Sequence, residues 1–366
     1  MKKMFLYVVF LGVTILILIN PTQSVYYAKK GLSMCSEIII PSLFPFFVCS
    51  GLLVYSGFCE VLAKITRPVM KPLFNVNPTG SAAFILGIIS GYPLGAVTAC
   101  QLYNGNYLSK SEAERLLAFC NNSGPLFILG AVGVSIYHST SVGVILYAAH
   151  ILGAICVGLV FKNYKRNTYN AEEYKLDTKK HSTGSLFSEV LTNSVSSILT
   201  ICACVVFSSV VANLFMDLLC LNPVFEALIQ SGLEFVSGLT KISYLDVNLF
   251  SKLLMSAWAC AFAGISVHLQ VMGVISKSEL SMKPYILGKL LHGIFAVIFT
   301  FLLLSFIPVS QSVFSALGKE QCMSIGFFAS SVFSVFAVLS VLMIMLCCVP
   351  AKLQEKLKLK RKKNIL

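Results

Sequence analysis

Two segments, SGYPLGA at 90–96 and CNNSGPLFILG at 120–130, interrupt apolar runs with glycine, proline and polar residues. Two similar interruptions follow later in the chain, GLEFVSG at 232–238 and FAGISVHLQ at 262–270. In hydrocarbon, a break in a helix leaves backbone N–H and C=O groups unpaired unless protein or water satisfies them. The four interrupted segments therefore predict membrane helices that break around a cavity.

The composition supports a membrane protein. Of the 366 residues, 57% are apolar and only 12% are charged, whereas a soluble chain is about 45–50% apolar and about 25% charged. So few charges cannot cover the surface of a soluble protein of this length. This excludes a soluble enzyme, a disordered chain and a nucleic-acid-binding module, and it predicts an all-α polytopic membrane protein.

The net charge of +13 is concentrated in short segments beside apolar runs. Most of it lies in the tail 350–366, in the linker 162–185 and at Lys2 and Lys3. Under the positive-inside rule, these segments face the cytoplasm, so we expect both termini to be cytoplasmic. The basic tail can also contact anionic lipid head groups, and the charge does not indicate a nucleic-acid partner.

The pattern of apolar runs predicts the topology, because a membrane-spanning helix needs roughly 20 apolar residues. Uninterrupted spans are predicted at 4–20, 38–58, 141–161, 195–216, 285–307 and 323–349, broken spans at 116–137 and 249–276, and re-entrant hairpins at 79–103 and 222–240. This makes about eight transmembrane helices and two re-entrant hairpins. Because one hairpin enters from the inside and the other from the outside, the order indicates an inverted repeat with its substrate site at the midplane.

The same pattern predicts the domain organisation. We expect an N-terminal membrane anchor (1–30), a first repeat (31–161), a cytoplasmic basic linker (162–185), a second repeat (186–349) and a basic cytoplasmic tail (350–366). The first apolar segment has the length of a retained span, although a cleaved signal peptide is the alternative.

Asn121, Asn122 and Ser123 lie just before Gly124 and Pro125, and this proline can open a helix. A helix N-terminus presents free N–H groups and a partial positive charge, and Ser123 can cap it. Together with the two amides, this arrangement suits a carboxylate or a polar heterocycle. The alternative is that the asparagines only satisfy the helix break.

The first hairpin repeats this arrangement, with Ser90 and Tyr92 at its tip and a proline opening the returning half. Its glycines also follow the small-xxx-small spacing at Gly87, Gly91 and Gly95, so tight helix packing is an equally good explanation of the motif.

In the second half, Ser266, His268 and Gln270 interrupt an apolar span, and His268 can act as a substrate ligand or proton carrier. Glu234 at the second hairpin tip is a candidate for binding a coupling proton or cation. The alternatives are a packing role for His268 and helix capping by Glu234. Lys289 and His292 lie near the inner end of a span, so we expect them to be interfacial, with no basic residue at the midplane.

No enzyme motif is present: the chain contains no HExxH, Walker A or GxSxG sequence. The thirteen cysteines form no CxxC pair and are scattered mostly through apolar runs. We therefore expect no catalytic residue, metal site or cofactor.

At SGYPLGA, at SKSEAERLLAFCNNSGPLFILGAVG (109–133) and at FAGISVHLQVMGVI (262–275), the chain resembles the YlbJ/SpoVV-type sporulation integral membrane proteins of the Gate, or nucleoside-recognition, superfamily. The resemblance covers about residues 30–350. It implies a place in the outer forespore membrane of a sporulating bacterium and transport of dipicolinic acid, a small planar dianion.

The resulting hypothesis is a transporter for a small anionic metabolite, with dipicolinate as the favoured substrate. One alternative is a non-transporting membrane scaffold that assembles with other sporulation membrane proteins. Another is a transporter for nucleosides or other small solutes.

Overall fold

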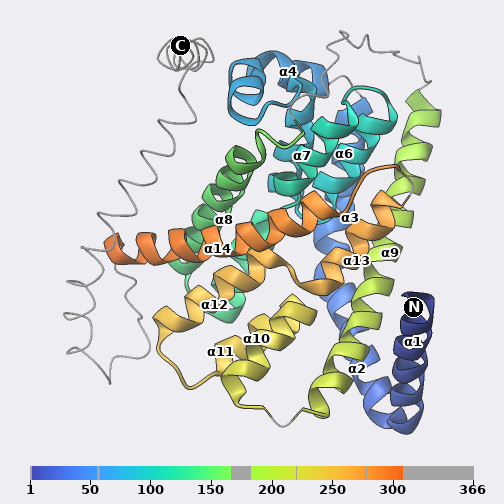
Figure 1. Ribbon diagram of the computed structural model, residues 1–366, viewed down its shortest axis with the longest axis vertical. Coiled ribbons are helices and arrows are strands. Elements are labelled where there is room, and N and C mark those ends of the chain that lie inside the picture. The colour runs from blue at the N-terminus through green and yellow to red at the C-terminus, as the bar shows by residue number, and fades with distance from the viewer. Residues whose placement is uncertain (1, 56–57, 166–182, 220, 277, 308–366) are drawn as a thin grey trace, which may run out of the picture. The chain divides into compact units, whose positions relative to one another are not determined.

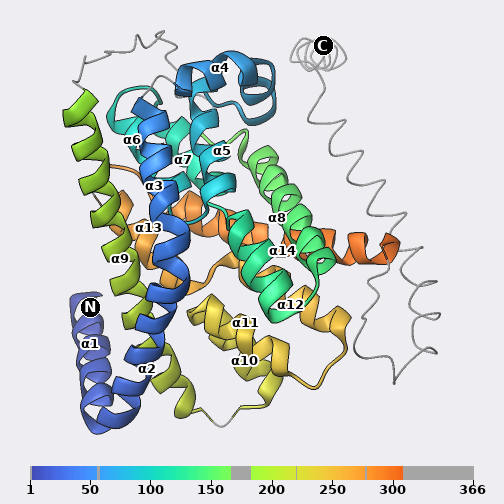
Figure 2. The same cartoon turned by 180° about the vertical axis from the view of Figure 1, so that it is seen from behind.

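The computed structural model describes residues 2–307, apart from 56–57, 166–182, 220 and 277. Residues 1–303 form one compact unit, which Figures 1 and 2 show from opposite sides. All regular structure in the described residues is helical, which confirms the predicted all-α membrane fold. The predicted span 323–349 and the tail 350–366 lie outside the described residues.

The N-terminal segment forms more helix than the apolar pattern predicts. It contains α1 (Lys2–Ile19), α2 (Pro21–Met34), η1 (Cys35–Ile39), α3 (Ile40–Tyr55), α4 (Phe58–Val69) and η2 (Met70–Phe74). The chain bends by 104° between Phe10–Ile19 and Pro21–Glu37, at the position where Pro21 can begin a helix but cannot continue one. The connection expected between the spans 4–20 and 38–58 is therefore helical and runs on into α3.

The next elements contain the first two predicted breaks. They are η3 (Pro78–Gly80), α5 (Ser81–Ser90), α6 (Leu94–Asn104), α7 (Lys110–Cys120), η4 (Leu126–Ile136) and α8 (Thr140–Phe161). Gly91 separates α5 from α6, and α6 begins directly after Pro93. A capping box of Ser109 and Glu112 starts α7, and the Ser-x-x-Glu pattern at 109–112 predicts this helix start from the sequence.

The second half contains the other two breaks. Its elements are α9 (Thr183–Asp217), α10 (Pro223–Leu233), α11 (Phe235–Tyr244), α12 (Leu249–Phe262), α13 (Gly264–Ile275) and α14 (Lys283–Phe306). The breaks fall at Glu234 and at Ala263, whose φ of 71° lies in the left-handed region. Helix α9 begins inside the predicted linker 162–185.

The order of elements recurs in the two halves. In each half, a hairpin of two short helices is followed by a broken helix pair and then by a long helix: α5–α6, α7–η4 and α8 in the first, α10–α11, α12–α13 and α14 in the second. In both views, α6 and α7 lie in the upper part and α10 and α11 in the lower part (Figures 1 and 2). This arrangement is consistent with hairpins that enter from opposite sides.

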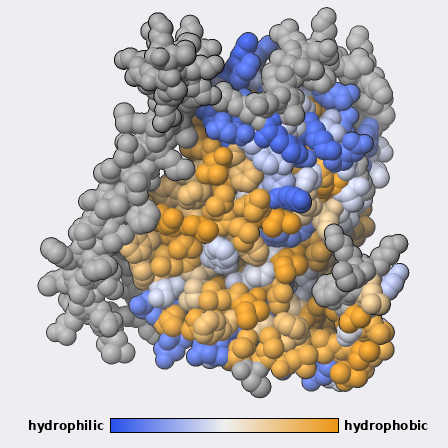
Figure 3. All heavy atoms as spheres, in the orientation of Figure 1, coloured by the Kyte–Doolittle hydropathy of each residue, from blue (hydrophilic) through white to orange (hydrophobic). Residues whose placement is uncertain are grey.

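Seven of the eight predicted spans fall within the described residues, and the number of candidate spans found there is lower. Among the described residues, four helices are long and apolar enough to cross a membrane, or six if each of two bent pairs counts as one span. The predicted broken span 116–137 is divided between α7 and η4, each of 11 residues and too short to cross alone. Figure 3 shows a broad apolar band below a hydrophilic region at the top of the view, as expected for a surface that faces lipid.

Two close approaches hold the end of α7 against its neighbours. A Cβ atom on Gly95 of α6 would collide with the backbone carbonyl of Cys120, and a Cβ on Gly288 of α14 would collide with the backbone of Ala118. Because both glycines lack a side chain, α6 and α14 can approach this end of α7 at backbone distance. The first residues of the α7–η4 break therefore lie beside α14.

The buried carboxylate of Glu114, near the middle of α7, connects this helix to two other segments of the chain. It accepts hydrogen bonds from the Lys165 Nζ at 2.7 Å and from the Ser281 backbone N–H at 3.2 Å. The hydrogen bond to this carboxylate raises the pKa of Lys165, which lies beyond the end of α8. Glu114 thus joins α7 to the segments that follow α8 and precede α14.

Candidate functional site

The four helix breaks meet in pairs. A Cβ atom on Gly91, whose φ is +88°, would lie 2.8 Å from the Gly124 nitrogen, so the two breaks of the first half touch. A Cβ on Gly264, whose φ is +66°, would lie 3.2 Å from the Phe235 nitrogen, so the breaks of the second half touch as well. Interruptions that are distant in sequence therefore come together, as expected for helices that break around a common site.

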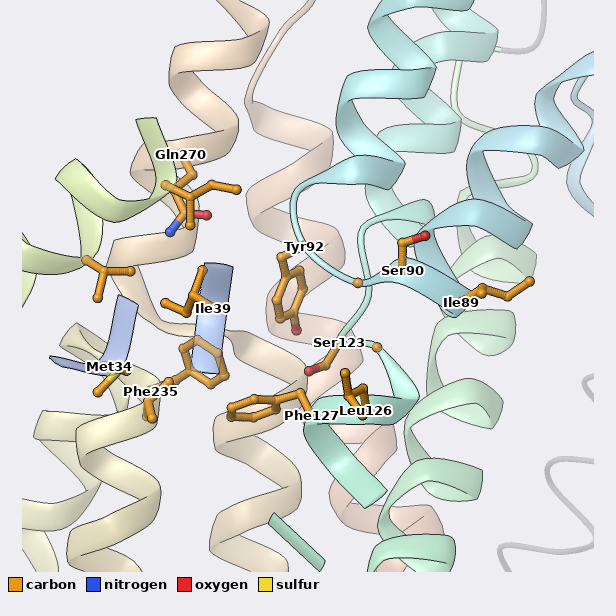
Figure 4. A pocket seen from close by; sticks show the side chains of 15 residues that line it. Met34, Ile39, Ile89, Ser90, Tyr92, Ser123, Leu126, Phe127, Phe235 and Gln270 are labelled. Atoms are coloured by element: carbon orange, nitrogen blue, oxygen red, sulfur yellow. The ribbon is translucent and has the colours of Figure 1, made fainter. Parts of the chain in front are cut away.

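A cavity of about 90 Å³ lies at these breaks (Figure 4). Its lining comes from three of the breaks and from α2, η1, α9 and α13, and it is mostly apolar. The predicted site residues that line it are Ser90, Tyr92, Ser123 and Gln270. Figure 4 shows Tyr92 near the centre of the lining, with Phe127 and Phe235 close to it. Such a cavity suits a small flat molecule with an apolar body.

Tyr92 connects the cavity to a buried polar cluster. Its hydroxyl donates a hydrogen bond to the Cys260 carbonyl at 2.5 Å and accepts one from the Lys289 Nζ at 3.4 Å. The ammonium group of Lys289 also lies 4.9 Å from the centre of the Tyr92 ring. Tyr92 therefore lines the cavity with its ring and contacts a cation with its hydroxyl.

Lys289 is 1% exposed, so the expectation that it is interfacial is wrong. Its ammonium group donates to three neutral acceptors: the Tyr92 hydroxyl, the Asn121 carbonyl at 3.0 Å and the His292 Nδ1 at 3.3 Å. No carboxylate in the described part of the chain pairs with it. Because a charged residue within a membrane-spanning helix is costly and therefore rare, such a buried lysine indicates a functional site.

His292 is also buried, which overturns the same expectation for it. Its Nε2 donates to the His150 carbonyl at 2.8 Å, so its Nδ1 is left as the acceptor for Lys289. The His150 ring lies 4.4 Å from the His292 ring, and its Nε2 accepts a hydrogen bond from the Ser123 backbone N–H at 3.0 Å. The two imidazoles thus tie α8 and α14 to the first-half break.

Two of these three residues, Lys289 and His292, were available to sequence reasoning through one signal. They fall inside the predicted span 285–307 and are three residues apart, which places them on one face of a helix. A cation within a predicted span is itself an indication of function. The contact of Gly288 with α7, which buries that face, is a tertiary feature.

Asn121 and His268, both predicted site residues, join this cluster. The Asn121 Nδ2 donates to the Tyr285 hydroxyl at 3.4 Å, and its Oδ1 is buried without a hydrogen-bond partner. The His268 ring packs against the Tyr285 ring at 5.1 Å, and its Nδ1 donates to the Gly264 carbonyl at 2.7 Å. The His268 Nε2 is likewise buried without a partner. The cluster therefore offers unpaired acceptors beside its cation.

The remaining predicted residues have local roles or lie apart from the cavity. The Asn122 side chain donates to the Phe119 carbonyl in its own helix end at 2.9 Å. Ser123 does not cap η4, because that helix begins after Pro125 without a side-chain cap, so this expectation is wrong. Ser266 is buried on α13 outside the cavity lining.

Glu234 caps a helix. Its carboxylate accepts hydrogen bonds from the backbone N–H groups of Val236 at 3.1 Å and Ser237 at 2.6 Å, at the start of α11. The capping alternative is therefore observed, and a role in binding a coupling proton or cation stays a prediction.

Comparisons with known proteins place this fold in a family. Residues 37–215, which include the first two breaks, match the Gate family model, described as nucleoside recognition. The chain is 32% identical over 334 residues to the sporulation integral membrane protein YlbJ of Bacillus subtilis (strain 168), and the match covers 80% of this chain and 81% of that protein. No solved structure matches the chain. At this identity over four fifths of both chains, the protein belongs to the family of YlbJ-type sporulation integral membrane proteins.

Proposed function

We propose that this protein is a transporter that moves a small anionic metabolite, dipicolinate, across the outer forespore membrane, with both termini in the cytoplasm. The observation that carries the proposal is the convergence of helix breaks from both halves of the chain on one cavity. Substrate sites of secondary transporters lie where discontinuous helices of two repeats meet. The family membership supports the sporulation setting.

Lys289 supports an anionic substrate. A dianion cannot be held in a membrane protein without compensating charge, and Lys289 supplies one positive charge directly behind the cavity wall formed by Tyr92. The aromatic lining from Phe127 and Phe235 suits a planar ring.

The transport step follows from the recurring element order. The first-half breaks contact each other at Gly91 and Gly124, and the second-half breaks contact each other at Gly264 and Phe235. Each pair can move as a body, so rocking of one half against the other would open the cavity to alternate sides.

A nucleoside is the second candidate substrate, because the matching family model is described as nucleoside recognition. Like dipicolinate, a nucleoside has a planar heterocycle that aromatic walls accommodate. It is uncharged, however, and so leaves the charge of Lys289 without a counter-charge. The basic tail at 350–366 can contact anionic lipids in either case.

The experiment is a flux measurement with the full chain in proteoliposomes. Radiolabelled dipicolinate and radiolabelled uridine are supplied in parallel to wild-type protein, to Gln270→Leu and to Gln23→Leu. Gln270 lines the cavity, whereas Gln23 is an exposed residue of α2, so the second variant controls for the loss of an amide. We expect dipicolinate flux in the wild type and in Gln23→Leu, and a flux reduced about tenfold in Gln270→Leu, the cost of one lost hydrogen bond to a charged ligand.

The alternatives give different results. Flux of uridine without flux of dipicolinate would replace the anionic substrate by a nucleoside. Absence of flux for both solutes in the wild type would contradict the transporter and favour the scaffold, whose partners would be other sporulation membrane proteins.

A further inference from the structure

Tyr92 separates Lys289 from the cavity. Tyr92 is part of the lining, whereas Lys289 is not, and the contact between the two is made by the Tyr92 hydroxyl and ring. In Figure 4, Tyr92 lies at the cavity with Ser123 and Phe127 near it. A molecule in the cavity therefore reaches the ammonium group of Lys289 only after the Tyr92 side chain has moved.

The three hydrogen bonds of Lys289 differ in how easily they are exchanged. The Asn121 acceptor is a backbone carbonyl, and the His292 acceptor is a side chain one turn along the same helix. The Tyr92 hydroxyl is the most distant of the three, at 3.4 Å, and it has a second, shorter bond to the Cys260 carbonyl. Tyr92 is therefore the partner that Lys289 can lose with the least rearrangement.

Replacing a neutral phenol by a carboxylate strengthens the interaction, because the ammonium group then faces an opposite charge as well as a hydrogen-bond acceptor. Resting on the proposed function, we propose that Lys289 binds one carboxylate group of a planar aromatic acid, and that this carboxylate displaces the Tyr92 hydroxyl from the ammonium group.

Two unpaired acceptors belong to the same cluster, and although neither lines the cavity, they can complete the contacts of the ligand once Tyr92 has moved. The Asn121 Oδ1 and the His268 Nε2 are buried without partners, and each can accept a hydrogen bond. Within the cluster as described, Lys289 is the one amine, so in its protonated form it neutralises one carboxylate. A second acidic group on the ligand then binds in its protonated form, as a donor to these acceptors. The site thus recognises one negative charge per ligand.

Equilibrium binding of radiolabelled dipicolinate to the full chain in lipid nanodiscs tests this assignment. In the wild type, pyridine-2-carboxylate, which has one carboxylate, should compete, and uncharged pyridine-2,6-dicarboxamide should not. Lys289→Met should weaken binding about 30-fold or more, the loss found when one member of a buried charge pair is removed. Lys283→Met, a change at an exposed residue of the same helix, should stay within about twofold of the wild type.

For Tyr92→Phe we expect tighter binding of dipicolinate, in contrast to Lys289→Met. The ring remains, the hydroxyl that competes with the carboxylate is lost, and binding should tighten about threefold to tenfold, the equivalent of one hydrogen bond. If the Tyr92–Lys289 contact had only a structural role, Tyr92→Phe would bind dipicolinate with the same affinity as the wild type or more weakly. Size-exclusion profiles confirm that each variant is folded, and Lys289→Arg, which keeps the charge, should bind more tightly than Lys289→Met.

The competition between analogues needs no variant, so it decides the proposal even if Lys289→Met does not fold. The role of Lys289 would be overturned if the dicarboxamide competed as strongly as pyridine-2-carboxylate. It would also be overturned if Lys289→Met bound dipicolinate with unchanged affinity, or if the wild type did not bind dipicolinate. Flux of dipicolinate in wild-type proteoliposomes would still uphold the proposed function in those cases. Binding without any flux would contradict the proposed function alone.

Discussion

At the scale of single residues, the glycines of the SGYPLGA motif and its polar residues have separate roles. Gly87 and Gly95 both lie against the backbone carbonyl of Cys120, so the small-xxx-small spacing serves close helix packing. Ser90 and Tyr92 line the cavity. The motif therefore contributes to close helix packing and to the cavity lining through different residues, and substrate binding by Ser90 and Tyr92 stays a prediction.

Gly95→Ala tests the packing role. A methyl group at this position would collide with a backbone carbonyl that cannot turn away, and overpacking of this kind costs about 1–3 kcal/mol. We expect a lower midpoint of thermal unfolding for the purified variant. Gly273→Ala on α13 is the matched control, because no atom lies within 4 Å of the added methyl and alanine favours a helix by about 1 kcal/mol. Equal midpoints for the two variants would show that the close approach of α6 to α7 does not limit stability.

At the scale of elements, each break is a helix end whose backbone groups need partners. At the α10–α11 break the Glu234 carboxylate supplies two acceptors. At the α7–η4 break the partners come from other helices, since the Ser123 N–H donates to His150 on α8 and the Asn121 carbonyl accepts from Lys289 on α14. The first type of break is self-contained, whereas the second depends on the tertiary structure.

Substitutions of Glu234 separate capping from ion coupling. Glu234→Asn keeps a capping acceptor and removes the titratable group, and Glu234→Ala removes both. We expect near wild-type thermal stability for the asparagine variant and a loss of about 1–2 kcal/mol for the alanine variant, the usual cost of a lost N-cap. Dipicolinate flux of the stable Glu234→Asn protein then decides the second role: wild-type flux limits Glu234 to capping, and lost flux assigns it to coupling.

At the scale of the whole molecule, the recurring element order predicts that the two hairpins are accessible from opposite sides of the membrane. The loop after α6 contains the exposed Asn106, and α11 ends at Tyr244, which is 85% exposed. With a cytoplasmic N-terminus, as the positive-inside rule predicts, the order of spans leads us to expect a cytoplasmic loop after α6 and an extracytoplasmic loop after α11.

Labelling with a membrane-impermeant maleimide checks this topology. In intact cells, Tyr244→Cys should be labelled and Asn106→Cys should be labelled only after permeabilisation, each measured above a parent in which the exposed Cys49 is serine. Labelling of both positions from the same side would contradict the inverted order, whichever side it is.

The sequence was sufficient to predict the membrane class, the positions of the four breaks and the capping box of α7. These features are local: composition sets the solvent, and glycine, proline and capping residues act within a turn of where they stand. It did not determine the bend at Pro21 or the number of unbroken spans, because apolar content does not reveal where a long helix turns.

Only the tertiary structure decided which polar residues form the site. Lys289, His292 and His150 gather at the α7–η4 break because Gly288 lets α14 approach α7 at backbone distance. That approach joins residues more than 140 positions apart in sequence, and no local pattern specifies such a pairing. The polar interruptions thus indicated where a site lies, and helix packing placed the cation in it.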